Sequence, residues 1–96
     1  MIGVIAVLKI KDGTAAEFEA IFSELSEKVR ANEAGNKLYQ LTKSRIEPNT
    51  YKVLELYADA EALATHGQTE YFKDLGRKMG AVMDGRPAVE VLDSVG

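Results

Sequence analysis

The sequence IGVIAVLKI, residues 2–10, is a short apolar run rich in β-branched side chains, and the turn signal Asp12-Gly13 follows it. Such a run is typical of a strand that is buried on both faces. Successive side chains of a strand point to opposite faces, so Ile5 and Val7 share one face of this strand. The other face consists of Ile2, Val4, Ala6, Leu8 and Ile10. Because both faces are apolar, both need a cover.

The segment after this strand predicts an amphipathic helix over residues 14–33. Thr14 can cap this helix, and Glu17 stands at the spacing that completes a capping box. Gly35 is well placed to end the helix in a left-handed turn. One apolar stripe follows the helical period and consists of Phe18, Ile21, Phe22, Leu25 and Val29.

Residues 37–45 and 51–58 have strand character and form a predicted hairpin around the turn Glu47-Pro48-Asn49-Thr50. In the second of these strands Leu54 and Leu56 face one way. The opposite face consists of Tyr51, Val53, Glu55 and Tyr57.

The remaining residues predict two helical pieces and a last strand. Asp59 can cap a short helix over residues 60–66, which Gly67 interrupts. Thr69 can cap a further helix, and the final strand covers residues 88–95.

The order of elements is β-α-β-β-α-β, and we expect residues 1–96 to form a single domain. With the rules for short connections and handedness, this order predicts an α+β, ferredoxin-like fold. The expected sheet has four antiparallel strands with the helices on one face. Strands 2–10 and 51–58 are expected at its centre because they are the most apolar.

Helices on one face leave the other face of the sheet bare. Several hundred Å² of contiguous apolar surface is near the limit that soluble monomers tolerate. Burying roughly 400 Å² per chain at about 25 cal/mol/Å² is a gross gain of ~10 kcal/mol. We therefore expect a homodimer packed sheet to sheet about a two-fold axis. The alternative is a wet sheet face with scattered apolar residues.

The charge balance is mildly acidic, with 12 Lys and Arg, 15 Asp and Glu, and a net charge of −3. This balance argues against nucleic acid and against an anionic membrane surface as partners. No apolar stretch approaches the roughly 20 residues of a spanning helix. Residues 1–13 lack the features of a signal peptide, so we expect a cytoplasmic protein.

Cysteine is absent, and His66 is the only histidine. Disulfides, thiolate zinc sites and a cysteine nucleophile are therefore excluded. Zinc and non-haem iron sites usually need two or more imidazoles. The sequence also lacks the glycine-rich motifs that hold nucleotides and the G-x-S-x-G turn that presents a serine nucleophile. We expect no metal and no cofactor.

Four motifs follow one another along most of the chain. They are Glu33-Ala-Gly35, Leu38-Tyr39-Gln-Leu41, Tyr51-x-Val53-x-Glu55-x-Tyr57-x-Asp59 and Ala62-Leu63-x-x-His66-x-x-Thr69-x-Tyr71-Phe72. Together they resemble the antibiotic biosynthesis monooxygenase (ABM) domain family, including its quinol monooxygenases. The resemblance implies a dimeric α+β barrel in which each subunit holds a small-molecule pocket between its sheet and its helices.

The chain departs from the family pattern at several positions. Tyr71 replaces the second histidine of the last motif, directly before Phe72. Haem-degrading relatives use an asparagine on the first strand, a tryptophan at the position of His66 and an iron-binding histidine at the position of Gly76. None of these is present, so the resemblance does not imply haem degradation.

Two residues are candidates for catalysis. Histidine is the side chain whose unperturbed pKa lies nearest neutrality, so His66 is the natural candidate base. The alternative is a half-buried histidine that bonds a backbone carbonyl. Glu55 is a carboxylate among apolar neighbours, where burial of a charge is costly. It can orient His66 or a substrate hydroxyl, or pair with Arg45, Lys43 or a partner chain.

A group of large side chains is suited to a planar aromatic ligand, because it offers flat apolar surface and phenolic hydroxyls. The predicted ligand-binding residues are Tyr39, Tyr57, Tyr71, Phe72 and Met79. The alternative is that these side chains fill the core.

The resemblance implies a cofactor-independent monooxygenase that oxidises a small quinol or hydroxylated aromatic molecule with O₂, with His66 as the base. Two alternatives stay open. One is a dimeric module that binds a small molecule without catalysis, and the other is an isomerase that uses His66 for proton transfer alone.

Overall fold

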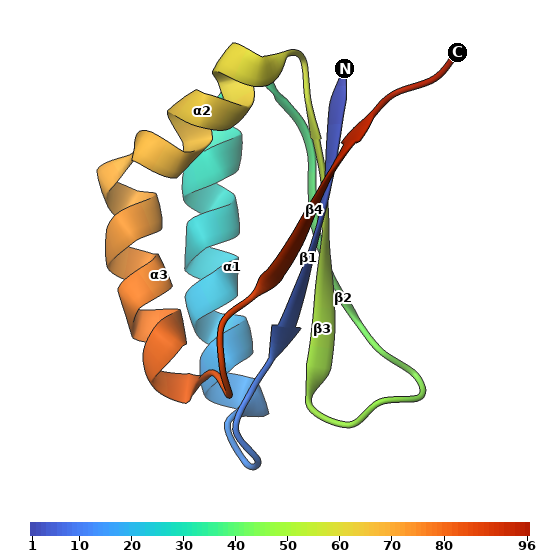
Figure 1. Cartoon of the computed structure of the whole chain (residues 1–96). Coiled ribbons are helices and arrows are strands. Elements are labelled where there is room, and N and C mark those ends of the chain that lie inside the picture. The colour runs from blue at the N-terminus through green and yellow to red at the C-terminus, as the bar shows by residue number, and fades with distance from the viewer.

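The computed structural model describes residues 1–96 and contains one four-stranded antiparallel sheet with helices on one face (Figure 1). The strands are β1 (Ile2–Lys9), β2 (Asn36–Lys43), β3 (Thr50–Tyr57) and β4 (Ala88–Asp93). Their order in the sheet is β2-β3-β1-β4, so the two most apolar strands are central. The predicted ferredoxin-like α+β fold is confirmed.

The helices are α1 (Ala15–Asn32), α2 (Ala60–Gln68) and α3 (Glu70–Val82). Both predicted caps of the later helices are present. The carboxylate of Asp59 accepts a hydrogen bond from the backbone N–H of Ala62 at 2.8 Å. The hydroxyl of Thr69 accepts one from the N–H of Phe72 at 3.3 Å. Thr69 has an extended backbone, which separates α2 from α3.

Three local predictions from the sequence are wrong. The hydroxyl of Thr14 donates to the carbonyl of Lys11 at 2.6 Å, so it makes no capping bond to α1. Gly67 lies inside α2 and does not interrupt it. Gly35 does not adopt a positive φ. Its place is explained by packing, since a Cβ there would lie 2.6 Å from the Cβ of Ala62 on α2.

The core lies between the helices and the sheet. Phe18 and Phe22 of α1 are buried against the aromatic side chains of β2 and β3. Phe22 stacks on Tyr39, with ring centroids 5.2 Å apart, and Phe18 lies 4.8 Å from Tyr51. α1 therefore packs over the β2–β3 half of the sheet.

The β4 edge lacks this cover. Val89 and Val91 pair with Ala6 and Val4 and so point to the helical side of the sheet. They nevertheless remain 60% and 58% exposed. The space between the helices and this edge is thus open to solvent.

The other face of the sheet carries apolar side chains and no helix. Leu38 and Leu54 are 44% and 37% exposed there, and Leu92 of β4 is 38% exposed. The pairs Ile5–Leu54 and Leu38–Leu56 place these side chains on a common face. Among the helices, none has both the length and the hydropathy needed to cross a membrane.

Candidate functional site

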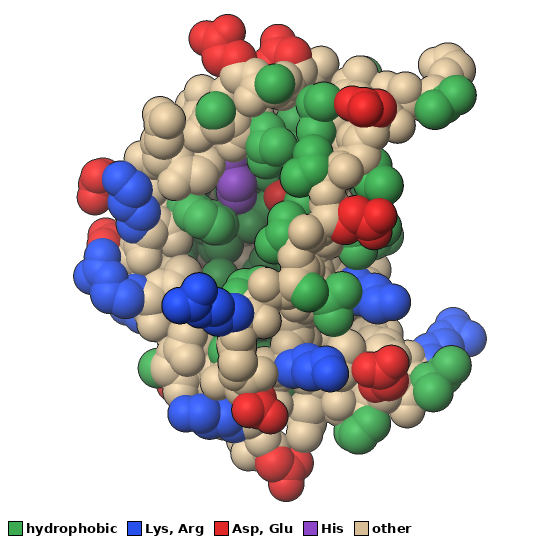
Figure 2. Space-filling view, viewed as in Figure 1, with side chains coloured by type: hydrophobic (Ala, Val, Ile, Leu, Met, Phe, Trp, Pro, Cys, Tyr) green, Lys and Arg blue, Asp and Glu red, His purple; other side chains and the backbone are tan.

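A cavity of about 280 Å³ lies between the sheet and the helices α2 and α3. Its lining is mainly apolar, and its polar-tipped side chains are Tyr39, Glu55 and His66. Figure 2 shows the hollow, with the histidine inside it among hydrophobic side chains. Val89 borders the cavity at the open edge of the sheet. An apolar cavity with a few polar groups is the usual form of a small-molecule site.

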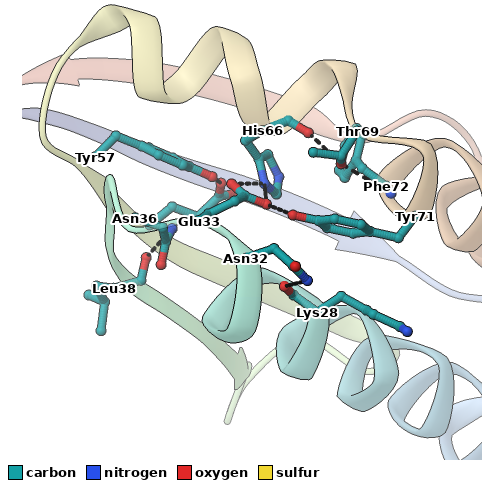
Figure 3. Close-up of polar contacts among 11 residues, drawn as sticks. Lys28, Asn32, Glu33, Asn36, Leu38, Tyr57, His66, Thr69, Tyr71 and Phe72 are labelled. Carbon is teal, nitrogen blue, oxygen red and sulfur yellow. Dashed lines mark hydrogen bonds and ion pairs between the residues drawn. The ribbon is translucent and has the colours of Figure 1, made fainter.

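His66 is buried on α2, and one side of its ring is fixed by a carboxylate (Figure 3). Its Nδ1 lies 3.0 and 3.1 Å from the two carboxylate oxygens of Glu33. An ionised carboxylate only accepts hydrogen bonds, so Nδ1 is the ring nitrogen that carries the proton.

The second ring nitrogen of His66 is available to a ligand. Nε2 has no hydrogen-bond partner in the protein. Every fully buried side-chain nitrogen or oxygen has such a partner, so Nε2 is not fully buried. Nε2 is therefore open to the cavity that His66 lines. With Nδ1 protonated, Nε2 has a free lone pair and can accept a proton.

Glu33 contacts the candidate base directly, and it is not among the site residues predicted from the sequence. It ends α1, and its side chain is only 5% exposed, as is that of His66. Its carboxylate also accepts a hydrogen bond from the hydroxyl of Tyr71 on α3. One carboxylate thus joins the end of α1 to both α2 and α3.

The sequence does contain a signal for this role. The C-terminal end of a helix carries partial negative charge, so an acidic residue there is unfavourable unless it has a partner. Glu33 stands at that end, and Arg30 is the basic residue of the last turn. A carboxylate at this position is less unfavourable where it has a partner, and in this fold its partners are His66 and Tyr71.

Glu55 lies on β3 and lines the cavity. Its carboxylate accepts a hydrogen bond from the hydroxyl of Tyr57 at 2.6 Å. Burial raises the pKa of Glu55 and the charge of Glu33 raises it further, while the Tyr57 hydrogen bond and His66 oppose the rise. The alternative pairings with Arg45 and Lys43 are wrong, because Glu55 forms no salt bridge.

Tyr39 also lines the cavity. Burial raises the pKa of Tyr39 well above its usual range, and the charges of Glu55 and Glu33 raise it further. Tyr39 therefore stays protonated, and its hydroxyl is not engaged by another side chain. It can donate a hydrogen bond to an oxygen of a bound molecule.

The structure brings only some of the predicted site residues to the cavity wall. Tyr39, Glu55, His66, Phe72 and Met79 all line it. The ring centroids of Phe72 and His66 lie 4.6 Å apart.

Tyr57 and Tyr71 do not line the cavity, although the sequence predicts that both bind the ligand. The hydroxyl of Tyr57 donates to Glu55 in the cavity wall, and that of Tyr71 donates to Glu33 outside it. Burial and the hydrogen bond to Glu55 raise the pKa of Tyr57, whereas burial and Glu33 raise that of Tyr71 to about 12. Both hydroxyls therefore act as donors.

A wider, open groove of about 570 Å³ lies between α1 and α3. Its lining is mostly charged and polar and includes Glu33 and Tyr71. It shares no lining residue with the apolar cavity. No three His, Cys, Asp or Glu side chains are grouped as metal ligands in the chain.

Comparison with known proteins identifies close relatives. The family model for antibiotic biosynthesis monooxygenases matches residues 1–78. A candidate antibiotic biosynthesis monooxygenase from Caulobacter crescentus CB15 is 54% identical, with a TM-score of 0.96 over 99% of this chain and 90% of its own. Another antibiotic biosynthesis monooxygenase of solved structure is 29% identical, with a TM-score of 0.91 over 100% of both chains.

More distant relatives share the fold alone. A conserved protein from Methanosarcina mazei Go1 is 22% identical, with a TM-score of 0.89 over 95% of this chain and 89% of its own. No functionally curated protein matches the chain.

Proposed function

Because this chain belongs to the antibiotic biosynthesis monooxygenase family, we propose that it oxidises a small quinol or hydroxylated aromatic molecule with O₂, without metal or flavin. The observation that carries the proposal is the Nε2 of His66, which has no protein partner and opens into a mainly apolar cavity. A base in such a place can deprotonate a bound hydroxyl.

The first step is the transfer of a proton from a substrate hydroxyl to Nε2 of His66. The phenolic hydroxyl of Tyr39 donates a hydrogen bond to the oxyanion that forms. Preorganised donors of this kind stabilise developing charge most strongly where water is excluded. The ring of Phe72 and the side chain of Met79 supply flat and adaptable apolar surface for the aromatic body of the substrate.

The second step uses the electron-rich anion itself. It transfers one electron to O₂, which gives a substrate radical and superoxide, and the two recombine to form a carbon–oxygen bond. The resulting peroxide loses water as its O–O bond breaks. A quinol and O₂ thus become a hydroxyquinone and one water, with the quinol as reductant and O₂ as oxidant.

Glu55 gives the cavity a second polar group on the β3 side. Because its pKa is raised, Glu55 is protonated to a greater extent at a given pH than a carboxyl group in water. A protonated carboxyl can donate a hydrogen bond to the substrate or to the peroxide. We propose that Glu55 and His66 act on different oxygen atoms of the ligand, because they come from different walls of the cavity.

Oxygen uptake with a panel of dihydroxyaromatic compounds tests the proposal. Wild-type protein should consume O₂ and form one quinone per O₂, and His66→Ala should reduce this rate by about 10²-fold or more. Tyr51→Phe serves as a control, because Tyr51 lies outside the cavity lining. Uptake that survives His66→Ala unchanged removes His66 as the base.

The same panel separates the two alternative functions. Binding of aromatic compounds without O₂ uptake would favour a non-catalytic binding module. Exchange of a substrate C–H proton with solvent, again without O₂ uptake, would favour an isomerase that uses His66 for proton transfer.

We further propose that the chain forms a homodimer through the open face of the sheet. The exposed side chains of Leu38, Leu54 and Leu92 support this, because they lie together on the face without helices. A second copy is the simplest cover for this apolar surface.

A further inference from the structure

We propose that Tyr71, Glu33 and His66 form a proton relay that connects the apolar cavity to the polar groove between α1 and α3. The inference rests on the proposed function, because it assigns a route to the proton that His66 takes from the substrate. Glu33 and Tyr71 do not line the cavity, so we define them as positioning residues that act through His66.

The three side chains make a continuous hydrogen-bonded chain from one space to the other. His66 lines the cavity, while Glu33 and Tyr71 line the groove. Nδ1 of His66 lies 3.0 Å from Glu33 Oε1, and the hydroxyl of Tyr71 donates to Oε2 of the same carboxylate. Figure 3 shows the three side chains pointing toward one another from three helices.

The surroundings give the imidazole no other polar partner than Glu33. His66 is packed against the rings of Tyr39, Tyr57 and Phe72, at centroid distances of 5.2, 5.5 and 4.6 Å. Neither Tyr39 nor Tyr57 forms a hydrogen bond with the imidazole, and the hydroxyl of Tyr57 donates to Glu55 instead.

The proton moves along the three side chains in sequence. Nε2 takes a proton from the substrate hydroxyl, and the imidazole releases its Nδ1 proton to the carboxylate of Glu33. The Tyr71 hydroxyl, which donates to Oε2 at rest, turns toward the groove, gives its own proton to water there and accepts the proton of Glu33 on its oxygen. The net result is one substrate oxyanion, a neutral His66 with its proton on Nε2 and one proton in solvent, and no electron moves in this step.

The chain offers a direct test, because a single histidine gives unambiguous imidazole signals in ¹⁵N NMR spectra. The measured quantities are the tautomer of His66 and the exchange rate of its Nδ1–H with water. Glu33→Gln keeps an acceptor for Nδ1–H but cannot carry a proton. We expect it to preserve the tautomer and to slow exchange by at least about tenfold, on the scale of general acid–base effects.

Tyr71→Phe distinguishes a relay from a simple cover. If Tyr71 passes protons, the loss of its hydroxyl slows the exchange of Nδ1–H. If Tyr71 only shields Glu33 from solvent, the exchange rate stays the same or rises, and the relay is refuted. Wild-type exchange in Glu33→Gln also refutes it.

Matched controls come from a similar pair elsewhere in the fold. The hydroxyl of Tyr51 donates to Glu19 at 2.5 Å, and neither residue lines the cavity. Tyr51→Phe and Glu19→Gln should leave the exchange of Nδ1–H unchanged. If exchange of Nδ1–H is slow in Glu33→Gln and Tyr71→Phe, but neither wild type nor any variant takes up O₂, the relay is supported and the monooxygenase is refuted. O₂ uptake that needs His66, with exchange unaffected by the variants, does the reverse.

Discussion

Replacing Gly35 by alanine should displace α2 and with it His66. A Cβ at position 35 would lie 2.6 Å from the Cβ of Ala62, whereas carbon atoms pack at about 3.5–4.0 Å. The methyl group of alanine has no rotatable bond that moves it away. The strand end and the helix must therefore separate by about 1 Å.

The magnitude follows from two opposing effects. Overpacking of this kind costs about 1–3 kcal/mol. Replacing glycine by alanine also restricts the unfolded chain, which stabilises the fold by only about 0.4–1 kcal/mol. Gly35→Ala should therefore lower the free energy of unfolding, and each kcal/mol lowers Tm by about 4–8 °C in a domain of this size. Thermal and urea unfolding measure both quantities.

A second substitution makes the test specific to this contact. Ala62→Gly alone should cost about 1 kcal/mol, because glycine is a poor helix former. Combined with Gly35→Ala, it removes the methyl group that clashes. We expect the double variant to be more stable than the sum of the single effects by about 0.5–3 kcal/mol. Additive effects, or a Gly35→Ala protein as stable as wild type, would refute the steric reasoning.

Three other predictions test the site and the assembly. Glu33→Ala should lower the free energy of urea unfolding by about 3–5 kcal/mol, because it leaves buried donors on His66 and Tyr71 unpaired, and Glu33→Gln should cost less; equal stability of wild type and Glu33→Ala would contradict the buried pairing. The pKa of Glu55 is raised in the folded protein above its ordinary value of 4.5. At pH values between 4.5 and the raised pKa, the folded state therefore binds more protons than the unfolded state. The stability that this proton contributes is complete below pH 4.5 and is lost as pH rises through the folded pKa; the stability of Glu55→Gln relative to wild type should therefore rise with pH in unfolding experiments, and a constant difference would contradict the shift. Leu54→Lys should convert the proposed dimer to a 10.5 kDa monomer in sedimentation experiments, whereas Ile46→Lys, on a side chain 91% exposed outside the sheet, should not; a wild-type protein that already sediments as a monomer would refute the dimer.

The fold was predictable because local pattern and topology agree along the chain. The apolar run in residues 2–10 and the alternation in residues 51–58 identified the central strands β1 and β3. Asp59 and Thr69 cap helices as their side-chain chemistry predicts. The left-handed turn predicted at Gly35 is wrong, because a glycine after a helix can serve either a positive φ or a close packing contact. Only the distance to Ala62 shows that close packing is the one in use.

The candidate site was predictable in its residue types but not in its contacts. His66, Glu55 and Tyr39 line one cavity, as a shared pocket requires. The partner of His66 is 33 positions away in sequence, at the end of another helix. Periodicity reports which face a residue lies on, but it does not report which helix ends meet. For that reason the sequence offered Glu55 as a partner and left Glu33 unassigned.

The site holds a single imidazole, because a tyrosine stands at position 71. The family pattern has a second histidine there, which would add another group that titrates near neutral pH. Burial and the carboxylate of Glu33 raise the pKa of Tyr71 to about 12, so its hydroxyl remains a donor throughout the physiological range. Glu33 therefore keeps the same partner on its α3 side whether or not His66 has taken a proton. In the proposed relay, Tyr71 thus returns to the same hydrogen bond with Glu33 after each proton that it passes to the groove.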